Sequence, residues 1–330
     1  MMRDPLPMST LAVPLSAIQE ARRRIASVAY RTPLYFSPKL SVMTNAKVYL
    51  KLECHQPIRV FKIRGAANKI LKLSDKERER GLVAASSGNH GLAVSYIANR
   101  LAIGATIVVP TNAVEEKVDA IEEYGASVVK YGLFHDERFS KALEIQRTTG
   151  AMLIHPFDDP DVIAGQGTIG LEICEDLPDL NTVIVPIGGG GLISGISIAI
   201  KNLKPDVKVL GVEPEKASSM YQSIKNGKIT HLSDTTSIAD GLATREPGVL
   251  TYEIAKHYVD EVLLVSEEQI EKAVFTVMKD CHLMVEPSAA AAVAGLLGKV
   301  HVRAEEKVVV VVSGGNISLR MMSRILSKYR

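Results

Sequence analysis

Cysteine is scarce in this chain of 330 residues, and the three that occur, Cys54, Cys174 and Cys281, are widely spaced and odd in number. Such a set predicts neither a disulfide framework nor a zinc site, and it is typical of a protein of the reducing cytoplasm. An excess of one charge is also missing, because the formal net charge is only +2. Nucleic acid and anionic membrane surfaces are therefore not expected as partners.

Long uninterrupted apolar segments are absent as well. The most apolar stretch, residues 182–200, is broken by Pro186 and by four consecutive glycines, so no membrane-spanning helix is predicted. The first residues, Met1-Met2-Arg3-Asp4-Pro5, lack the apolar core of a signal peptide. What remains is the composition of an ordinary globular enzyme, with 46% hydrophobic and 23% charged residues.

Apolar runs typical of strands alternate with segments of helical spacing along most of the chain. The predicted strands are residues 47–52, 81–85, 105–110, 126–130, 181–186, 207–212, 262–265 and 307–312. The predicted helices are residues 63–73, 91–100, 115–124, 192–203, 267–279 and 288–298. This alternation predicts an α/β protein with mostly parallel sheets between layers of helices. We expect two lobes, with a ligand cleft at the carboxyl ends of the strands.

Four glycines, Gly188 to Gly191, follow a predicted strand and precede a helix that begins near Leu192. The backbone N–H groups of such a loop, together with the helix N-terminus, can bind a terminal phosphate. No Gly-Lys-Ser/Thr follows, so the loop is not a Walker motif, and it lacks the acidic residue of a dinucleotide site. A tight turn without a ligand is the alternative.

Lys62 follows the apolar residues Val60 and Phe61 and stands just before a predicted helix. A lysine in such a place is often a surface residue. If it is partly buried instead, its pKa falls and more of it is free amine. A free amine can form a Schiff base with an aldehyde and can later act as a base.

Two further polar loops follow predicted strands. The loop from Ser86 to His90 offers hydroxyls, an amide and helix-start N–H groups, which suit a carboxylate and a hydroxyl group. Its alternative role is to cap the next helix. Ser313 follows the valine run 308–312, so its hydroxyl is expected at the end of a buried strand, where clefts form. The alternative for Ser313 is a turn residue before two glycines.

In this order and over this length, the four motifs resemble those of fold-type II pyridoxal-phosphate enzymes, specifically the threonine/serine dehydratase and serine racemase family. The resemblance runs from about Tyr30 to about Leu319 and also includes Lys51–Glu53, His155–Asp159, Gly165–Thr168, Ile238–Ala243 and Val285–Ala289. It implies a two-lobed α/β fold of the tryptophan synthase β type, with the active site in the interdomain cleft. The large phosphate-binding domain would comprise residues 1–55 and 151–330, and the small substrate-side domain residues 56–150.

The resemblance also implies pyridoxal 5′-phosphate as cofactor and a role for each matching residue. The cofactor-binding residues would be Lys62, which carries the aldehyde, Phe61, Asn89 at the ring hydroxyl, Gly188, Gly189, Gly190, Gly191 and Leu192 at the phosphate, Gly241, Glu286, and Ser313 at the ring nitrogen. The residues at the substrate carboxylate would be Ser86, Ser87, Asn89 and His90. The catalytic residues would be Lys62 and Ser87.

The implied activity is that of an L-threonine/L-serine dehydratase, a cytoplasmic ammonia-lyase that acts on a small hydroxy amino acid. A neutral Ser313 at the ring nitrogen favours prompt loss of the β-hydroxyl. The alternatives are a serine racemase, in which Ser87 returns a proton on the face opposite Lys62, and a non-catalytic binding protein of the same fold. Val60 stands where many relatives have serine, which bears on specificity. A homodimer or homotetramer is expected.

Glu213, Ala217 and Ser219 resemble the family's site for a divalent cation, Mg²⁺ or Ca²⁺. In relatives the last of these ligands is an aspartate, and the serine found here is a weaker ligand for a hard cation. The alternative for Glu213 is a solvated carboxylate in a loop.

Overall fold

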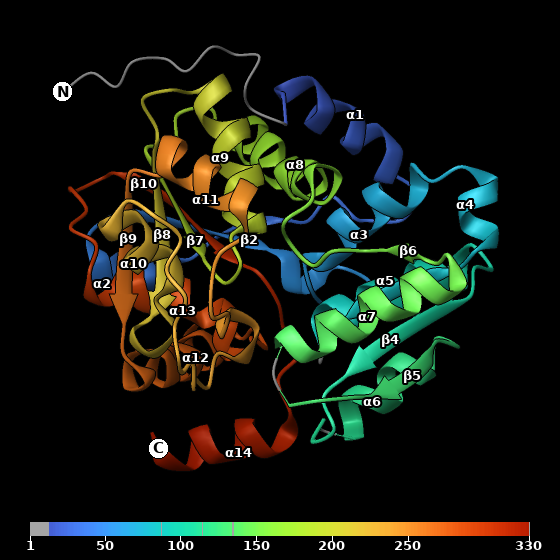
Figure 1. Cartoon of the computed structure of the whole chain (residues 1–330). Helices are drawn as coiled ribbons and strands as arrows, with labels where there is room; N and C mark the ends of the chain where they lie inside the picture. The colour runs from blue at the N-terminus through green and yellow to red at the C-terminus, as the bar shows by residue number, and fades with distance from the viewer. Residues whose placement is uncertain (1–12, 87, 114, 134, 330) are drawn as a thin grey trace.

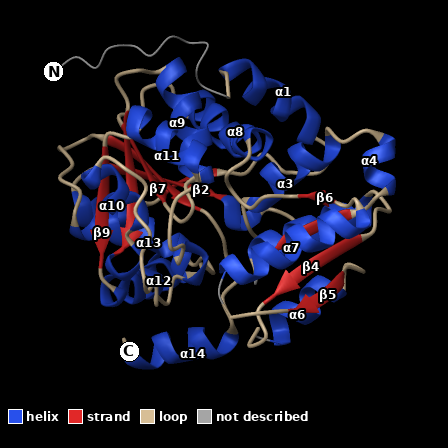
Figure 2. Cartoon of the chain, in the orientation of Figure 1, coloured by secondary structure: helices blue, strands red, loops and turns tan. Residues whose placement is uncertain are grey.

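The computed structural model describes residues 13–86, 88–113, 115–133 and 135–329, whose strands form two sheets (Figure 1, Figure 2). The larger sheet has the order β1-β2-β10-β7-β8-β9 and comprises β1 (Leu34–Phe36), β2 (Lys47–Leu52), β7 (Thr182–Pro186), β8 (Lys208–Pro214), β9 (Glu261–Val265) and β10 (Lys307–Val312). The smaller sheet has the order β5-β4-β3-β6 and comprises β3 (Leu82–Ala85), β4 (Ala105–Val109), β5 (Ser127–Lys130) and β6 (Met152–Leu153). The predicted α/β fold with parallel-rich sheets is thereby confirmed.

Helices cover both sheets (Figure 2). In the first half of the chain they are α1 (Leu15–Ile25), α2 (Pro38–Thr44), α3 (Lys62–Leu71), α4 (Asp75–Glu79), α5 (Asn89–Arg100), α6 (Glu115–Glu122) and α7 (His135–Thr149). In the second half they are α8 (Pro160–Asp176), α9 (Gly191–Leu203), α10 (Ser219–Asn226), α11 (Val249–Tyr258), α12 (Glu267–Cys281), α13 (Pro287–Gly298) and α14 (Leu319–Lys328). Short 3₁₀ turns are η1 (Glu53–His55), η2 (Glu215–Ala217) and η3 (Asp240–Leu242). Within the described ranges, no helix is long and apolar enough to cross a bilayer.

The strand β10 lies inside the larger sheet, and its sequence explains its place. Five consecutive valines, Val308 to Val312, are all buried. They pair in parallel with β2 on one side and with β7 on the other. A strand that is covered on both faces must be apolar throughout, and β-branched side chains suit such a strand. At the edge, β1 pairs antiparallel with β2.

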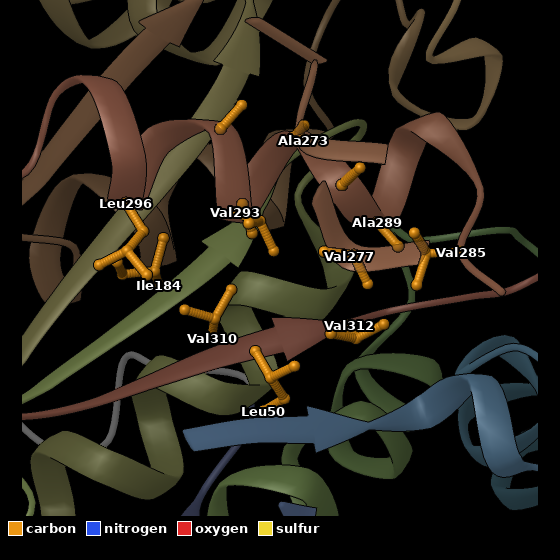
Figure 3. Close-up of a cluster of buried hydrophobic side chains, with 14 of the residues drawn as sticks. Leu50, Ile184, Ala273, Val277, Val285, Ala289, Val293, Leu296, Val310 and Val312 are labelled. Carbon is orange, nitrogen blue, oxygen red and sulfur yellow. The ribbon is translucent and has the colours of Figure 1, made fainter. Parts of the chain in front are cut away.

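The core of the larger lobe lies on both faces of this sheet. Figure 3 shows one face, where Leu50, Val310 and Val312 point from the strands toward Val277 of α12 and Val293 of α13. The opposite face carries α8, α9 and α11, whose apolar side chains pack on the same strands in a second cluster. The alanine-rich sequence of α13 allows this helix to pack closely, since ten of its residues are buried.

The smaller sheet is parallel throughout its described pairs. Apolar residues of α3, α5 and α6 cover one face, and those of α7 cover the other. The strand β6 pairs with β3 and so lies in the smaller sheet. Its residues, 152 and 153, belong to the predicted large domain, which was expected to resume at residue 151. The division into domains by residue number stays a prediction.

Glycines allow α8 to pack directly between α3 and α9 (Figure 1). A Cβ atom on Gly165 of α8 would collide with the carbonyl of Arg64 on α3, and one on Gly195 of α9 would collide with the carbonyl of Ile163 on α8. The three helices therefore touch through their backbones. This contact fixes the spacing between the start of α3, where Lys62 lies, and the start of α9, where the four glycines lie.

A buried group of four charges ties α3 to its neighbours. Arg64 donates to Glu53 through Nε over 2.8 Å and to Glu172 through Nη1 over 2.6 Å. Lys51 donates to Glu172 over 2.6 Å and to the carbonyl of Thr32 over 2.7 Å. Two cations and two carboxylates balance, so the group is neutral, as a buried ionic network must be. It holds the helix that begins with Lys62 against α8 and the end of β2.

Candidate active site

Lys62 is the first residue of α3, and main-chain contacts place it beside the end of β10. The N–H group of Phe61 donates to the carbonyl of Ser313 over 3.0 Å. The Nζ atom of Lys62 donates to the carbonyl of Pro156 over 2.7 Å. Burial penalises the charged form and lowers the pKa of Lys62 to about 8. At neutral pH, more of this amine is therefore unprotonated than in an exposed lysine.

The loop predicted to hold a carboxylate connects β3 with α5. The Oγ atom of Ser86 accepts a hydrogen bond from the N–H of Gly88 over 3.2 Å. Asn89 begins α5, and its side-chain amide donates to both carboxyl oxygens of Glu286, over 2.8 and 3.1 Å. Ser87 lies outside the described residues, so its catalytic and substrate-binding roles stay predictions.

His90 is buried on the first turn of α5, and its ring is engaged by the main chain. Its Nε2 atom lies 2.8 Å from the carbonyl oxygen of Ile154. A carbonyl can only accept a hydrogen bond, so Nε2 carries the proton. This contact ties α5 to the end of β6. His90 also lines the cleft, and its predicted contact with the substrate carboxylate stays a prediction.

The four glycines form the turn between β7 and α9. Gly190 has a φ of +96°, in the left-handed region that favours glycine. A Cβ atom on Gly189 would overlap the ring of Phe157, so this ring lies directly against the loop. The first N–H groups of α9 have no partner within the helix and point out of its N-terminus. The turn therefore has the geometry of an anion cradle.

A chain of hydrogen bonds joins the polar residues at the carboxyl end of β10. Asn316 donates to the side-chain oxygen of Asn89 over 2.9 Å, while the amide of Asn89 faces Glu286. Burial raises the pKa of Glu286 to about 7, although the hydrogen bond from Asn89 opposes the shift. Gly314 leaves room for this carboxyl group, because a Cβ atom there would overlap it. Ser313, also buried, is the first residue after the strand.

These residues line one cleft of about 530 Å³, which lies within the size range of small-molecule sites. Every described residue that the sequence assigned to the cofactor or substrate lines it, namely Phe61, Lys62, Ser86, Asn89, His90, Gly188, Gly189, Gly190, Gly191, Leu192, Gly241, Glu286 and Ser313. The cleft therefore contains both the amine of Lys62, whose pKa is lowered, and the glycine loop, whose N–H groups can bind an anion. It fits a phosphate-bearing aldehyde such as pyridoxal phosphate.

Other residues of the cleft received no role from the sequence. One of them is Asn316, three residues after Ser313. Additional charged residues of the lining are Lys117, Asp136, Asp158 and Arg245. These four come from loops and helix ends far apart in the chain, so only the folded structure brings them together.

The three residues of the predicted cation site lie away from the cleft. Both carboxyl oxygens of Glu213 accept backbone N–H groups, from Met220 over 2.9 Å and from Tyr221 over 2.8 Å. Burial raises the pKa of Glu213 to about 8. The Oγ atom of Ser219 is buried without a hydrogen-bond partner in the described part of the chain. Ala217 is also buried.

This donor set is a poor fit for a divalent cation. It offers a single carboxylate, whose two oxygens already accept N–H groups, whereas Ca²⁺ takes six to eight oxygen ligands and Mg²⁺ needs six in octahedral geometry. Among the described residues, no group of three or more histidine, cysteine, aspartate or glutamate side chains could hold a metal ion. The divalent cation stays a prediction, and no step of the chemistry depends on it.

Comparison with known proteins gives one consistent result. Residues 25–314 match the family described as pyridoxal-phosphate dependent enzyme. The L-threonine ammonia-lyase of Thermotoga maritima is 47% identical over 316 residues, which are 96% of this chain and 79% of that protein. The catabolic L-threonine dehydratase TdcB of Escherichia coli strain K12 is 43% identical over 317 residues, 96% of each chain. The solved structure of maize serine racemase matches with a TM-score of 0.91 at 37% identity, over 96% of this chain and 98% of that one.

Proposed function

The chain belongs to the family of pyridoxal-phosphate dependent enzymes, and from this premise we propose that it is an L-threonine/L-serine ammonia-lyase. Such an enzyme removes water from a hydroxy amino acid and yields a 2-keto acid and ammonia. The similarity to two enzymes named for threonine, at 47% and 43% identity over 96% of this chain, supports the proposal. The observation that carries it is the partly buried amine of Lys62, with a pKa of about 8, in one cleft with the glycine cradle.

When bound, pyridoxal phosphate supplies an electron-withdrawing ring that makes the α-proton of an amino acid removable. Groups of the protein would bind the cofactor and the substrate and remove the proton. Lys62 would hold the aldehyde and, as a free amine, would serve as the base for the α-proton. The N–H groups of Gly188 to Gly191 would hold the phosphate, and the start of α5 at Asn89 would offer N–H groups to the substrate carboxylate. Holding base and substrate in one geometry lowers the barrier by up to about 7–11 kcal/mol.

Ser313 affects the expected reaction because its side chain carries no negative charge. Its neutral hydroxyl, buried at the end of β10, offers no negative charge to keep a ring nitrogen protonated. With Ser313 at its nitrogen, the cofactor ring would withdraw electrons less strongly than a ring paired with a carboxylate. Such a ring would favour elimination of the β-hydroxyl.

The second candidate is a serine racemase with lyase side activity. The match to maize serine racemase at a TM-score of 0.91 favours it, as does the serine at position 87, which in a racemase would return a proton on the face opposite Lys62. The third candidate, a non-catalytic binding protein, would bind the cofactor without turnover. The three candidates differ in products, so one set of assays separates them.

The experiment is to reconstitute the purified protein with pyridoxal phosphate and to supply L-threonine, L-serine, threo-3-hydroxyaspartate and phenylserine. We expect 2-keto acid release, and with L-serine more pyruvate than D-serine. Lys62→Ala should lower the lyase rate by at least about 10²–10⁴-fold, the usual contribution of a positioned base. Lys72→Ala, at the other end of α3, is the matched control and should retain the wild-type rate.

Each contrary result selects another candidate. D-serine in excess over pyruvate would establish the racemase, and bound cofactor without any turnover would establish the binding protein. Full lyase activity of Lys62→Ala would refute the assigned base.

We also propose that the enzyme works in the cytoplasm as a homodimer or homotetramer. The three cysteines, Cys54, Cys174 and Cys281, are buried free thiols, which supports a reducing compartment. Exposed apolar side chains on β1 and α2, among them Phe36 and Val42, support burial against a second subunit.

A further inference from the structure

The glycine cradle, Gly188 to Gly191, depends on contacts with other residues to fix the orientation of its peptide planes. Gly188 to Gly191 have no side chains that could fix their peptide planes, and glycine loses more conformational freedom on ordering than any other residue. An N–H group binds a phosphate well only if it already points at it before the ligand arrives. The contacts behind the loop therefore decide how well it binds.

Thr251, in the first turn of α11, makes the contact that fixes one of these planes. Its side chain is fully buried, and Oγ1 donates to the carbonyl of Gly189 over 2.7 Å. The N–H of Gly248 points at the same carbonyl over 3.4 Å. The C=O of Gly189 and the N–H of Gly190 belong to one planar trans peptide and point in opposite directions. With the carbonyl held on α11, the N–H of Gly190 is turned away from α11.

The same hydroxyl packs against the loop. A Cβ atom on Gly190 would lie 2.9 Å from Oγ1 of Thr251 and 2.8 Å from the terminal methyl of Met220. Gly190 thus rests on two side chains from behind, while the cleft is in front of it. Thr251 itself does not line the cleft, so its contribution is made through the loop.

Asp158 fixes the helix that carries Thr251. Its carboxylate accepts the N–H groups of Val249 over 3.0 Å, Leu250 over 3.0 Å and Thr251 over 3.1 Å, and so caps α11. Two residues earlier, the carbonyl of Pro156 accepts the Nζ hydrogen bond of Lys62. The loop of residues 156–158 therefore contacts both the amine of Lys62 and the helix that carries Thr251.

We propose that Thr251 is a positioning residue for the cofactor phosphate: its hydroxyl fixes the peptide between Gly189 and Gly190, and Asp158 fixes Thr251. This inference rests on the assignment of Gly188 to Gly191 to the phosphate. It identifies two residues outside the direct binding set that determine how tightly pyridoxal phosphate is held, independently of the chemistry that follows.

The test compares Thr251→Val, which removes the hydroxyl but keeps the shape, with Thr251→Ser, which keeps the hydroxyl. The dissociation constant for pyridoxal phosphate is measured by equilibrium dialysis, together with the Tm of apo- and holoprotein and the ³¹P resonance of the bound phosphate. Thr251→Val should raise the dissociation constant about tenfold, the effect of one lost hydrogen bond. It should also shift the ³¹P resonance and reduce the Tm gained on cofactor binding. Thr251→Ser should stay within about twofold of wild type.

Thr182→Val is the matched control, because it also removes a buried hydroxyl, at the far end of β7, where Oγ1 donates to Glu306. It should leave the dissociation constant unchanged. Asp158→Asn, which keeps the shape of the cap, should weaken cofactor binding about threefold to tenfold and provides a second test if Thr251→Val does not fold.

The proposal is overturned if Thr251→Val binds the cofactor as tightly as wild type, or if Thr251→Ser is as weak as Thr251→Val, which would assign the effect to shape alone. A purely structural role would lower the Tm of apo- and holoprotein equally, and that result would also reject it. Failure of wild type itself to bind pyridoxal phosphate would instead contradict the proposed function.

Discussion

At the scale of single residues, the site depends on how burial changes two ionisable groups in opposite directions. Burial lowers the pKa of Lys62 to about 8 because an ammonium loses its hydration, and it raises the pKa of Glu286 to about 7 because a carboxylate loses its own. Both groups are therefore poised near neutral pH. Perturbed groups that share one cleft are typical of catalytic sites.

The lowered pKa of Lys62 predicts how fast the apoprotein captures its cofactor. With a pKa of about 8, roughly one amine in ten is unprotonated at pH 7, against roughly one in three thousand for a lysine of unperturbed pKa. Only the free amine attacks the aldehyde, so the capture rate should rise about tenfold from pH 6 to pH 7 and level off above pH 8. Stopped-flow absorbance measures the rate, with Lys62→Ala as the blank. A rate that still climbs steeply at pH 9.5 would indicate an ordinary lysine.

Residue type and order were enough to predict residues that lie together in one cleft. Lys62, Ser313 and the glycines of the cradle stand in short motifs next to predicted strands, and the structure brings them into one cleft. Thr251 could not be found in this way, and Asp158 received no role although it stands in one of the matching segments, because both contact the main chain of residues that are 62 and about 90 positions away. No local pattern records such a contact.

At the scale of elements, runs of apolar residues predicted the strands well. The bounds of β2 and β10 were predicted without error, and Ser266 caps the helix α12 that was predicted to begin after it. The helix α8 was missed because its three glycines, at positions 165, 167 and 170, lower helix propensity. The strand β1 was missed because three residues give too short an alternation. In both cases tertiary contacts decide the structure.

Glycines of α8 and of its neighbour α9 allow the two helices to touch, and this predicts an inverted effect of alanine. In an exposed helix, Gly→Ala stabilises by about 1 kcal/mol. Gly195→Ala should instead destabilise by about 1–3 kcal/mol, because its Cβ would collide with the carbonyl of Ile163 and the backbone of Gly167, which cannot move aside. Urea unfolding monitored by circular dichroism measures the difference.

The matched control for that substitution is Gly104→Ala. A Cβ atom at Gly104 would meet nothing within 4 Å, and the residue does not have a left-handed φ. Its free energy of unfolding should change by less than about 1 kcal/mol, and in the stabilising direction. If Gly195→Ala proved equally harmless, the backbone contact between α8 and α9 would not hold the two helices together.

At the scale of the whole molecule, the cleft is lined by residues that follow strands of both sheets, and two ion pairs connect the parts of the chain on its two sides. Lys117 on α6, beside the smaller sheet, pairs with Asp240 in η3, beside the larger one. Arg245 and Asp136 form a second pair across the same cleft at 4.0 Å. Both pairs connect residues beside the smaller sheet with residues beside the larger one, so they help to hold the two sides of the cleft together.

The pair between Lys117 and Asp240 predicts a charge-dependent affinity for substrate. Both side chains are exposed, and such a pair is worth about 0.2–1 kcal/mol, or at most about fivefold in an equilibrium constant that depends on it. Lys117→Glu should raise the KM for L-threonine by up to about fivefold, with less than about 1 kcal/mol change in the free energy of unfolding. The double variant Lys117→Glu/Asp240→Lys should return the KM toward wild type, because the pair is restored in reverse. High salt should shrink the difference between wild type and single variant, because it screens exposed charges. If the double variant is worse than either single one, Lys117 acts on the substrate itself rather than by holding the lobes together.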